Sequence, residues 1–148
     1  MPYQHLLVPT DGSELAARAV AQAAALAKAL EARLTLFHVQ TAFPISLVGV
    51  GELVDPATVD ALIEAAREHS RSVLGDAQEL AAQEGVVAAT LCDENPVPHK
   101  AIVAAAERLG CDLVVMASHG RRGLQGALLG SETQRVLSHC SLPVLVVR

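Results

Sequence analysis

The chain has 148 residues, of which 51% are hydrophobic and 2% aromatic, and its formal net charge at pH 7 is −5. This length suits one domain, expected to span residues 1–148, with a core of Ala, Leu and Val. The acidic balance and the scarcity of aromatic side chains argue against a nucleic-acid-binding surface, which needs a basic stripe or stacking platforms. No apolar run approaches the roughly 18 residues of a membrane helix, and the first residues lack the basic and hydrophobic regions of a signal peptide. We therefore expect a cytoplasmic protein that binds neither nucleic acid nor membrane.

The cysteines and histidines do not have the spacing of a metal site. Cys92, Cys111 and Cys140 are widely separated and form no CxxC pair, and the six histidines are scattered. The pattern favours reduced thiols, as is typical of a cytoplasmic protein, and no metal ligand is assigned.

Two periodicities alternate along the chain. A short apolar strand is predicted at residues 5–9, followed by turn residues and an Ala-rich helix with Ser13 as its N-cap. A second strand is predicted at residues 33–39. The apolar residues near helical spacing between them are Leu15, Ala19, Leu26 and Leu30.

A long helix is predicted after a loop that contains Pro and Gly. Asp55 is its expected N-cap, Pro56 its first helical residue and Gly85 its end. A third strand is predicted at residues 86–92, before a turn. The series expected to form one buried face of the helix is Leu62, Ala66, His69, Val73, Ala77 and Leu80.

The remaining elements continue the alternation. A helix stopped by Gly110 precedes a strand at residues 112–117, and a strand at residues 143–147 ends the chain. Between these strands, Ser131 and Gln134 match a capping box at the start of a last helix. Apolar strands separated by helices predict an α/β fold, a Rossmann-like, doubly wound parallel sheet of five strands with helices on both faces.

The stretch MASHGRRGLQGALLGSETQ, residues 116–134, is the candidate functional site. Ligands of doubly wound sheets lie beyond the carboxyl ends of the strands. A helix start at Ser131 offers free N–H groups and a partial positive charge to an anion, and glycines before it let the backbone approach a phosphate. Arg121 and Arg122 add charge for such contacts. The alternative is a surface loop with solvated arginines.

The standard phosphate and hydrolase motifs do not fit this stretch. No GxxxxGK[ST] is present, and the glycines at 49 and 51 are not followed by a third glycine in a dinucleotide fingerprint. MASHG is similar to a nucleophile elbow with Ser118 as nucleophile beside His119, but a Gly-rich loop follows where an elbow needs a helix.

The order of HLLVPTDGS, LFHV, DLVVMASHGRRGLQGALLGSETQRVL and PVLVV resembles the universal stress protein family along essentially the whole chain. The resemblance implies a sheet of order 3-2-1-4-5, an adenine nucleotide alpha hydrolase-like fold. ATP-binding members of that family carry G-x-x-G, nine residues, then G-S or G-T. Here Gly120, Gly130 and Ser131 match this motif, and Ala117 replaces its first glycine.

The resemblance also implies roles for individual residues. Asp11 would accept hydrogen bonds from the ribose hydroxyls, while Pro9 and Thr10 would shape the adenine pocket. Val39 would meet the base edge through its backbone, and Met116 would line the pocket. The full candidate cofactor-binding set is Pro9, Thr10, Asp11, Val39, Met116, Ala117, His119, Gly120, Arg121, Arg122, Gly130, Ser131 and Glu132.

Two of these residues depart from what a phosphate site needs. Ala117 is harmful only if its φ must be positive or the ligand touches its Cα, and at a strand end we expect an extended backbone. Glu132 lies in the first turn of the last helix, where it would repel a triphosphate unless it points outward or holds a divalent cation. Arg121, Arg122 and Arg135 would offset its charge.

By this resemblance the chain is expected to be a homodimeric stress or signalling protein that binds ATP, ADP or AMP, with Mg²⁺ as a companion ion, and is not a dedicated catalyst. The dimer would pair the last strand, Pro143 to Val147, with its copy. One alternative is a slow ATPase or phosphotransferase that uses Asp11, His119 or Glu132. Another is a dimeric interaction module that has lost nucleotide binding.

Overall fold

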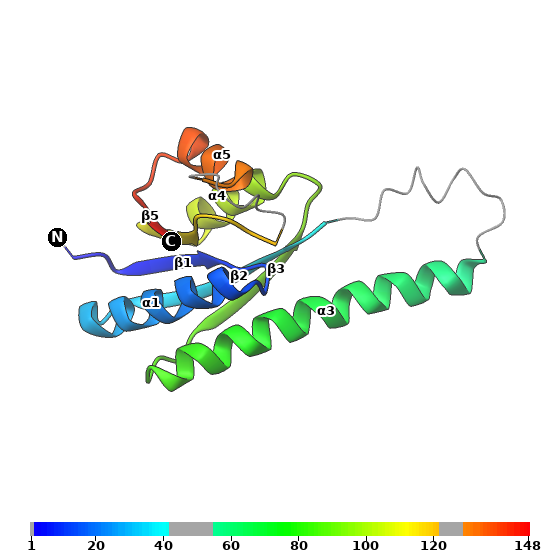
Figure 1. Cartoon of the computed structure of the whole chain (residues 1–148), viewed down its shortest axis with the longest axis horizontal. Helices are drawn as coiled ribbons and strands as arrows, with labels where there is room; N and C mark the ends of the chain where they lie inside the picture. The colour runs from blue at the N-terminus through cyan, green and yellow to red at the C-terminus, as the bar shows by residue number, and fades with distance from the viewer. Residues whose placement is uncertain (1, 42–54, 122–128) are drawn as a thin grey trace.

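Five parallel strands form one sheet in the order β3-β2-β1-β4-β5 (Figure 1). The computed structural model describes residues 2–41, 55–121 and 129–148. The predicted doubly wound sheet and its strand order are confirmed, and the winding reverses between β1 and β4. The strands are β1 (His5–Pro9), β2 (Arg33–Gln40), β3 (Ala89–Glu94), β4 (Leu113–Ala117) and β5 (Val144–Val147).

Helices cover both faces of this sheet. α1 (Glu14–Leu30) and α3 (Pro56–Gln83) lie on one face, and α4 (Pro98–Arg108) and α5 (Ser131–His139) lie on the other (Figure 1). Successive strand residues point to opposite faces, so each layer of helices packs on its own apolar cluster. None of the helices in the described parts of the chain is long and apolar enough to cross a membrane.

Most of the residues that α1 buries are alanines. Ser13 is the N-cap, as predicted, and its hydroxyl accepts a hydrogen bond from the N–H of Ala16 at 3.2 Å. The predicted leucines, Leu15 and Leu26, are only partly buried at the edges of this contact. Small side chains let the helix axis approach the strands, and the buried residues of α1 are Ala16, Ala19, Val20, Ala23, Ala24 and Ala27.

The predicted buried face of α3 is correct only in the second half of the helix. Val73 and Ala77 are buried, as expected, but Leu62 and His69 are exposed. The first part of α3 extends past the sheet (Figure 1), so nothing in the described chain covers it there. Periodicity predicted the helix correctly, but it carries no information on which turns the sheet reaches.

The ends of α3 follow their sequence signals, whereas the start of β3 does not. Asp55 is the N-cap, and Gly85 follows the helix with a φ of 82°, which glycine adopts without strain. The N–H of Val86 donates to the Ala81 carbonyl at 3.0 Å, so Val86 is still bonded to the last turn of α3 and is not part of the sheet. β3 therefore begins at Ala89, not at Val86 as predicted.

Leu36→Ala should lower the free energy of unfolding by about 2–5 kcal/mol, because truncating a buried leucine leaves a cavity. Leu36 is 0% exposed and lies in the cluster beneath α1 and α3. The control, Leu62→Ala, removes a side chain that is 39% exposed and should change the free energy by about 0.5 kcal/mol or less. Urea unfolding with equal m values measures both, and equal costs would contradict this assignment of the core.

Candidate functional site

The carboxyl ends of β1 and β4 bring most of the predicted site residues together. β1 ends at Pro9 and β4 at Ala117, and the two strands are neighbours in the sheet. Thr10 and Asp11 follow β1 directly, and Gly120 lies shortly after β4. This edge is the expected ligand position in a doubly wound sheet.

Asp11 and Gly120 are in direct contact. The Asp11 carboxylate accepts hydrogen bonds from the backbone N–H of Ser13 to Oδ1 and of Arg121 to Oδ2, each at 2.9 Å. A Cβ on Gly120 would lie 2.6 Å from Asp11 Oδ2, closer than any real Cβ contact. The missing side chain of Gly120 is therefore what allows the carboxylate and the loop backbone to meet.

These contacts keep the Asp11 carboxyl ionised. Burial raises its pKa, but hydrogen bonds from Ser13 and from the backbone N–H of Arg121 outweigh burial and leave the pKa below its ordinary value. An ionised carboxylate accepts about four hydrogen bonds in all. Asp11 thus has acceptor capacity left for the hydroxyl groups of a ligand.

Two hydrogen bonds return the Gly-rich loop to the end of β4. The Gly130 N–H donates to the Ser118 carbonyl at 2.6 Å, and the Thr133 hydroxyl donates to the Ala117 carbonyl at 2.8 Å. A Cβ on Gly130 would lie 3.1 Å from the Ser118 carbonyl oxygen, so glycine permits this approach. The start of α5 is thereby placed beside Gly120 and Asp11.

The first turn of α5 has no side-chain cap. Its N-cap is Gly130, not Ser131, and the side chain of Gln134 donates to the Leu129 carbonyl at 3.2 Å. The predicted capping box is therefore wrong, because Ser131 already has helical geometry and Gln134 reaches a different partner. No side chain competes from the N-cap for the N–H groups of this turn, which suits them to an anion.

Glu132 points toward α4. Its Oε2 accepts a hydrogen bond from the backbone N–H of His99 at 2.9 Å, and its Oε1 lies 2.5 Å from Arg135 Nη1. Glu132 thus caps the first turn of α4 and is paired with a cation. Of the two arrangements the sequence left open for Glu132, the structure has the one in which the carboxylate is directed outward.

The other predicted residues in the sheet have the expected backbone. Val39 lies near the end of β2 and is half-buried, and Met116 is buried on the face covered by α4 and α5. Ala117 pairs with Val147 as the last residue of β4, and it is not among the described residues with positive φ. The extended backbone predicted for Ala117 is confirmed.

Arg121 and His119 lie at the start of the loop. Arg121 Nη2 would lie 3.1 Å from a Cβ on Gly12, so its guanidinium reaches back over the turn before α1. His119 Nδ1 is 2.9 Å from the hydroxyl of Ser118, which is only 2% exposed. A hydroxyl so buried is poorly placed for attack, which argues against the nucleophile elbow. Arg122 lies outside the described residues.

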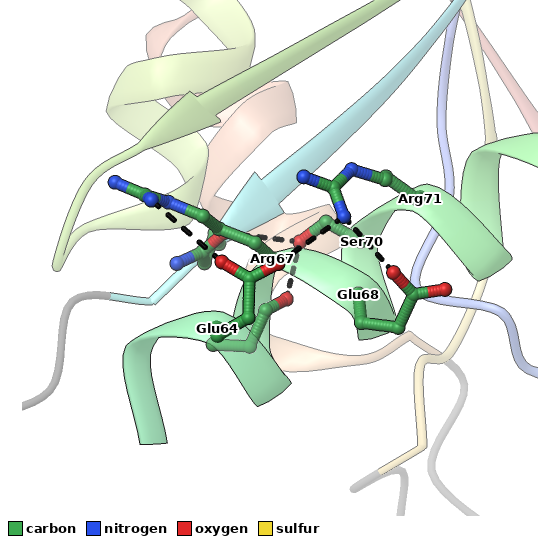
Figure 2. Close-up of polar contacts among 7 residues, drawn as sticks. Glu64, Arg67, Glu68, Ser70 and Arg71 are labelled. Carbon is green, nitrogen blue, oxygen red and sulfur yellow. Dashed lines mark hydrogen bonds and ion pairs between the residues drawn. The ribbon is translucent and has the colours of Figure 1, made fainter. Parts of the chain in front are cut away.

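A separate hollow of about 200 Å³ lies between α3 and the ends of β2 and β3. Its arginines are paired with glutamates: Arg71 Nη1 lies 2.9 Å from Glu68 and 3.4 Å from Glu64 (Figure 2). Such exposed pairs contribute little to stability. The hollow contains none of the predicted site residues; it is lined by Gln40, Arg67, Ser70, Arg71, Leu74 and Cys92.

Three residues that support the candidate site were not predicted from the sequence. The Thr133 hydroxyl donates to the end of β4, and the backbone N–H of His99 donates to the Glu132 carboxylate. His38 Nδ1 lies 2.8 Å from the Thr10 carbonyl oxygen. In the sequence these are a threonine and a histidine within helices and a histidine within an apolar strand. No local pattern separates them from ordinary core residues.

Gly120→Ala should raise the pKa of Asp11 toward its ordinary value of about 3.9. The new Cβ would lie 2.6 Å from Oδ2 and push the carboxylate off the Arg121 N–H. A lowered folded-state pKa adds stability above the unfolded pKa that is lost as pH falls through the folded pKa. The variant should therefore lose less stability than the wild type on acidification.

NMR titration of the Asp11 carboxyl measures this change, and unfolding at several pH values measures the stability. Gly75→Ala is the matched control, because a Cβ there has nothing within 4 Å. An Asp11 pKa that stays the same in Gly120→Ala would contradict the contact.

Comparison with known proteins agrees with this fold. The model of the universal stress protein family matches residues 2–148. Universal stress protein YxiE of Bacillus subtilis is 32% identical over 99% of this chain and 99% of its own length. The solved structure of hypothetical protein MJ0577 of Methanocaldococcus jannaschii has a TM-score of 0.81 and 28% identity, covering 99% of this chain and 96% of that one. A universal stress protein in complex with cAMP has a TM-score of 0.71 and 26% identity, covering 100% of this chain and 98% of its own. The chain belongs to the universal stress protein family and has its adenine nucleotide alpha hydrolase-like fold.

Proposed function

We propose that the protein binds an adenine nucleotide (ATP, ADP or AMP) at the carboxyl ends of β1 and β4, and that it acts in stress response or signalling. One observation carries the proposal: the ionised Asp11 lies against Gly120, beside the uncapped start of α5. A hydrogen-bond acceptor for a sugar and an anion site are thus adjacent. The related structure in complex with cAMP supports the class of ligand.

Asp11 would hold the ribose. Its two oxygens already accept one backbone hydrogen bond each, from Ser13 and Arg121. The Ser13 side chain also hydrogen-bonds to the carboxylate, so what remains of its roughly four acceptor positions would receive the neighbouring hydroxyl donors of ribose. Hydrogen bonds to a charged acceptor are the stronger kind, so Asp11 would contribute a large share of the affinity.

The phosphates would bind at the start of α5. Gly120 and Ser131 would supply N–H groups there, and the helix end adds partial positive charge. Gly130 would contribute by its missing side chain, because its own N–H is already bonded to the Ser118 carbonyl. Arg121 supplies a full positive charge beside the turn before α1. Glu132, held by His99 and Arg135, does not oppose an anion in this place.

The base would lie over the ends of β1, β2 and β4. Pro9, Thr10, Val39 and Met116 occupy those ends, and Ala117 offers its backbone beside them. Mg²⁺ is proposed only as the ion that accompanies ATP. His119 completes the candidate set at the start of the loop.

Asp11→Ala should weaken ATP binding about 10- to 100-fold, the cost of losing hydrogen bonds to a charged group. Calorimetry with ATP and Mg²⁺ measures the affinity, and Asp76→Ala, an exposed change on α3, is the control. Native mass spectrometry of freshly purified protein tests the same proposal through a co-purified nucleotide. Adenosine that binds as tightly as ATP would contradict the phosphate half of the site.

Other outcomes favour the alternatives. No heat and no thermal shift at millimolar nucleotide would favour an interaction module without nucleotide binding. Release of ADP well above background that stops in Asp11→Ala would favour a slow ATPase or phosphotransferase.

A homodimer through β5 is also proposed. β5 is an edge strand of the sheet, and Leu145 within it is 42% exposed. Leu137 on the neighbouring helix is equally exposed. Pairing β5 with its copy across a two-fold axis would cover this edge and the apolar side chains beside it.

Sedimentation at micromolar concentration should show twice the chain mass of 15.4 kDa. Leu145→Asp should give a monomer, because it would bury a charge at the pairing edge. Val87→Asp is the control, since Val87 is 99% exposed and lies just before β3, at the opposite edge. A wild-type protein of monomer mass would overturn the dimer.

A further inference from the structure

His38 lies buried behind the turn that carries Asp11. It belongs to β2, immediately before Val39, and the residue is 8% exposed. Its Nδ1 is 2.8 Å from the carbonyl oxygen of Thr10. A carbonyl only accepts hydrogen bonds, so Nδ1 carries the proton and the ring donates it.

Thr10 is bonded to β2 through both of its backbone polar groups. Its N–H donates to the Phe37 carbonyl at 2.8 Å, continuing the sheet by one residue, and its carbonyl receives His38. β1 ends at Pro9, so the backbone of β2 offers the Thr10 carbonyl no ladder partner, and a side chain takes that place. Thr10 is itself only 7% exposed, and a buried carbonyl without a donor costs free energy.

The peptide held in this way is the one that leads into Asp11. The next residue, Gly12, has a φ of 78° and turns the chain into α1. With Thr10 held and Gly12 turned, the Asp11 carboxylate is directed at Gly120. A rotation of the Thr10–Asp11 peptide would swing the carboxylate away.

The ring of His38 also contacts a second ring. His69 of α3 meets it edge to face, with ring centroids 6.0 Å apart. The ring is therefore held between α3 and the turn after β1, and its Nδ1 is kept aimed at Thr10.

We propose that His38 is a positioning residue of the nucleotide site: its Nδ1–H holds the Thr10 carbonyl and so fixes where Asp11 meets the ribose. The inference rests on the proposed adenine-nucleotide site. His38 acts through the backbone of Thr10 and does not touch the ligand.

The test separates the hydrogen bond from the shape of the ring. His38→Phe keeps a ring and removes the donor, and it should weaken ATP binding about tenfold. His38→Asn places an amide nitrogen where Nδ1 was, and it should restore affinity to within about threefold of the wild type. A residue that serves only as core filling would show the opposite order, since Phe fills the space better than Asn.

His5→Phe is the matched control. His5 is also a buried histidine of the sheet, and it lies at the start of β1, at the opposite end of that strand from the site. Its Nε2 is 2.8 Å from the hydroxyl of Thr35 in β2. The substitution removes a buried hydrogen bond of the same kind and should leave ATP affinity unchanged. Equal affinity in His38→Phe and the wild type, or an equal loss in His5→Phe, would overturn the inference.

A readout without ligand keeps this result separate from the proposed function. If the wild type binds no nucleotide, the proposed function is wrong. The NMR resonances of the Asp11 carboxyl and the Gly12 amide, measured without ligand, then test whether His38 positions the Thr10–Asp11 peptide. They should shift in His38→Phe and stay near wild-type positions in His38→Asn; unchanged resonances in His38→Phe would overturn the inference. If His38→Phe does not fold, His38→Gln replaces it with the same expectations, because its amide nitrogen matches Nε2 and not Nδ1.

Discussion

The site depends on the return of the Gly-rich loop to the end of β4. The Gly130 N–H and the Thr133 hydroxyl bond to the consecutive carbonyls of Ser118 and Ala117. Glycine makes the first of these contacts possible, since a Cβ would crowd the Ser118 carbonyl. Because α5 then starts beside the turn after β1, the proposed anion site and the Asp11 carboxylate share one edge of the sheet.

In our proposal an acidic protein binds a polyanion, and the two carboxylates at the proposed site already have hydrogen-bond partners. The Glu132 carboxylate accepts a hydrogen bond from the first turn of α4 and pairs with the guanidinium of Arg135. Asp11 is held by two backbone N–H groups, and it faces the sugar half of the site in our proposal. The net charge of −5 therefore says little about the local field at the start of α5.

Several features of the fold were predictable because their requirements are local. Ser13 and Asp55 are N-caps as predicted, and the extended backbone of Ala117 follows from its place at a strand end. The capping box failed for a physical reason: α5 begins at Ser131 as predicted, but its N-cap is Gly130, whose N–H bonds to the Ser118 carbonyl, and the Gln134 side chain donates to the Leu129 carbonyl. The predicted burial of the first half of α3 was wrong for another reason: the spacing of apolar residues predicts a helix, but it does not show which of its turns the sheet covers.

By itself, the sequence determined the alternation of strands and helices, the order of the sheet through family resemblance, and the glycines at the loop ends. These follow from residue periodicity, turn chemistry and motif spacing, all of which act over a few residues. Only the tertiary structure decided that Glu132 turns to α4, that Gly120 meets Asp11 and that His38 holds Thr10. Those contacts join residues far apart in the chain, and their partners are chosen by how the packed layers bring backbone groups within hydrogen-bonding distance.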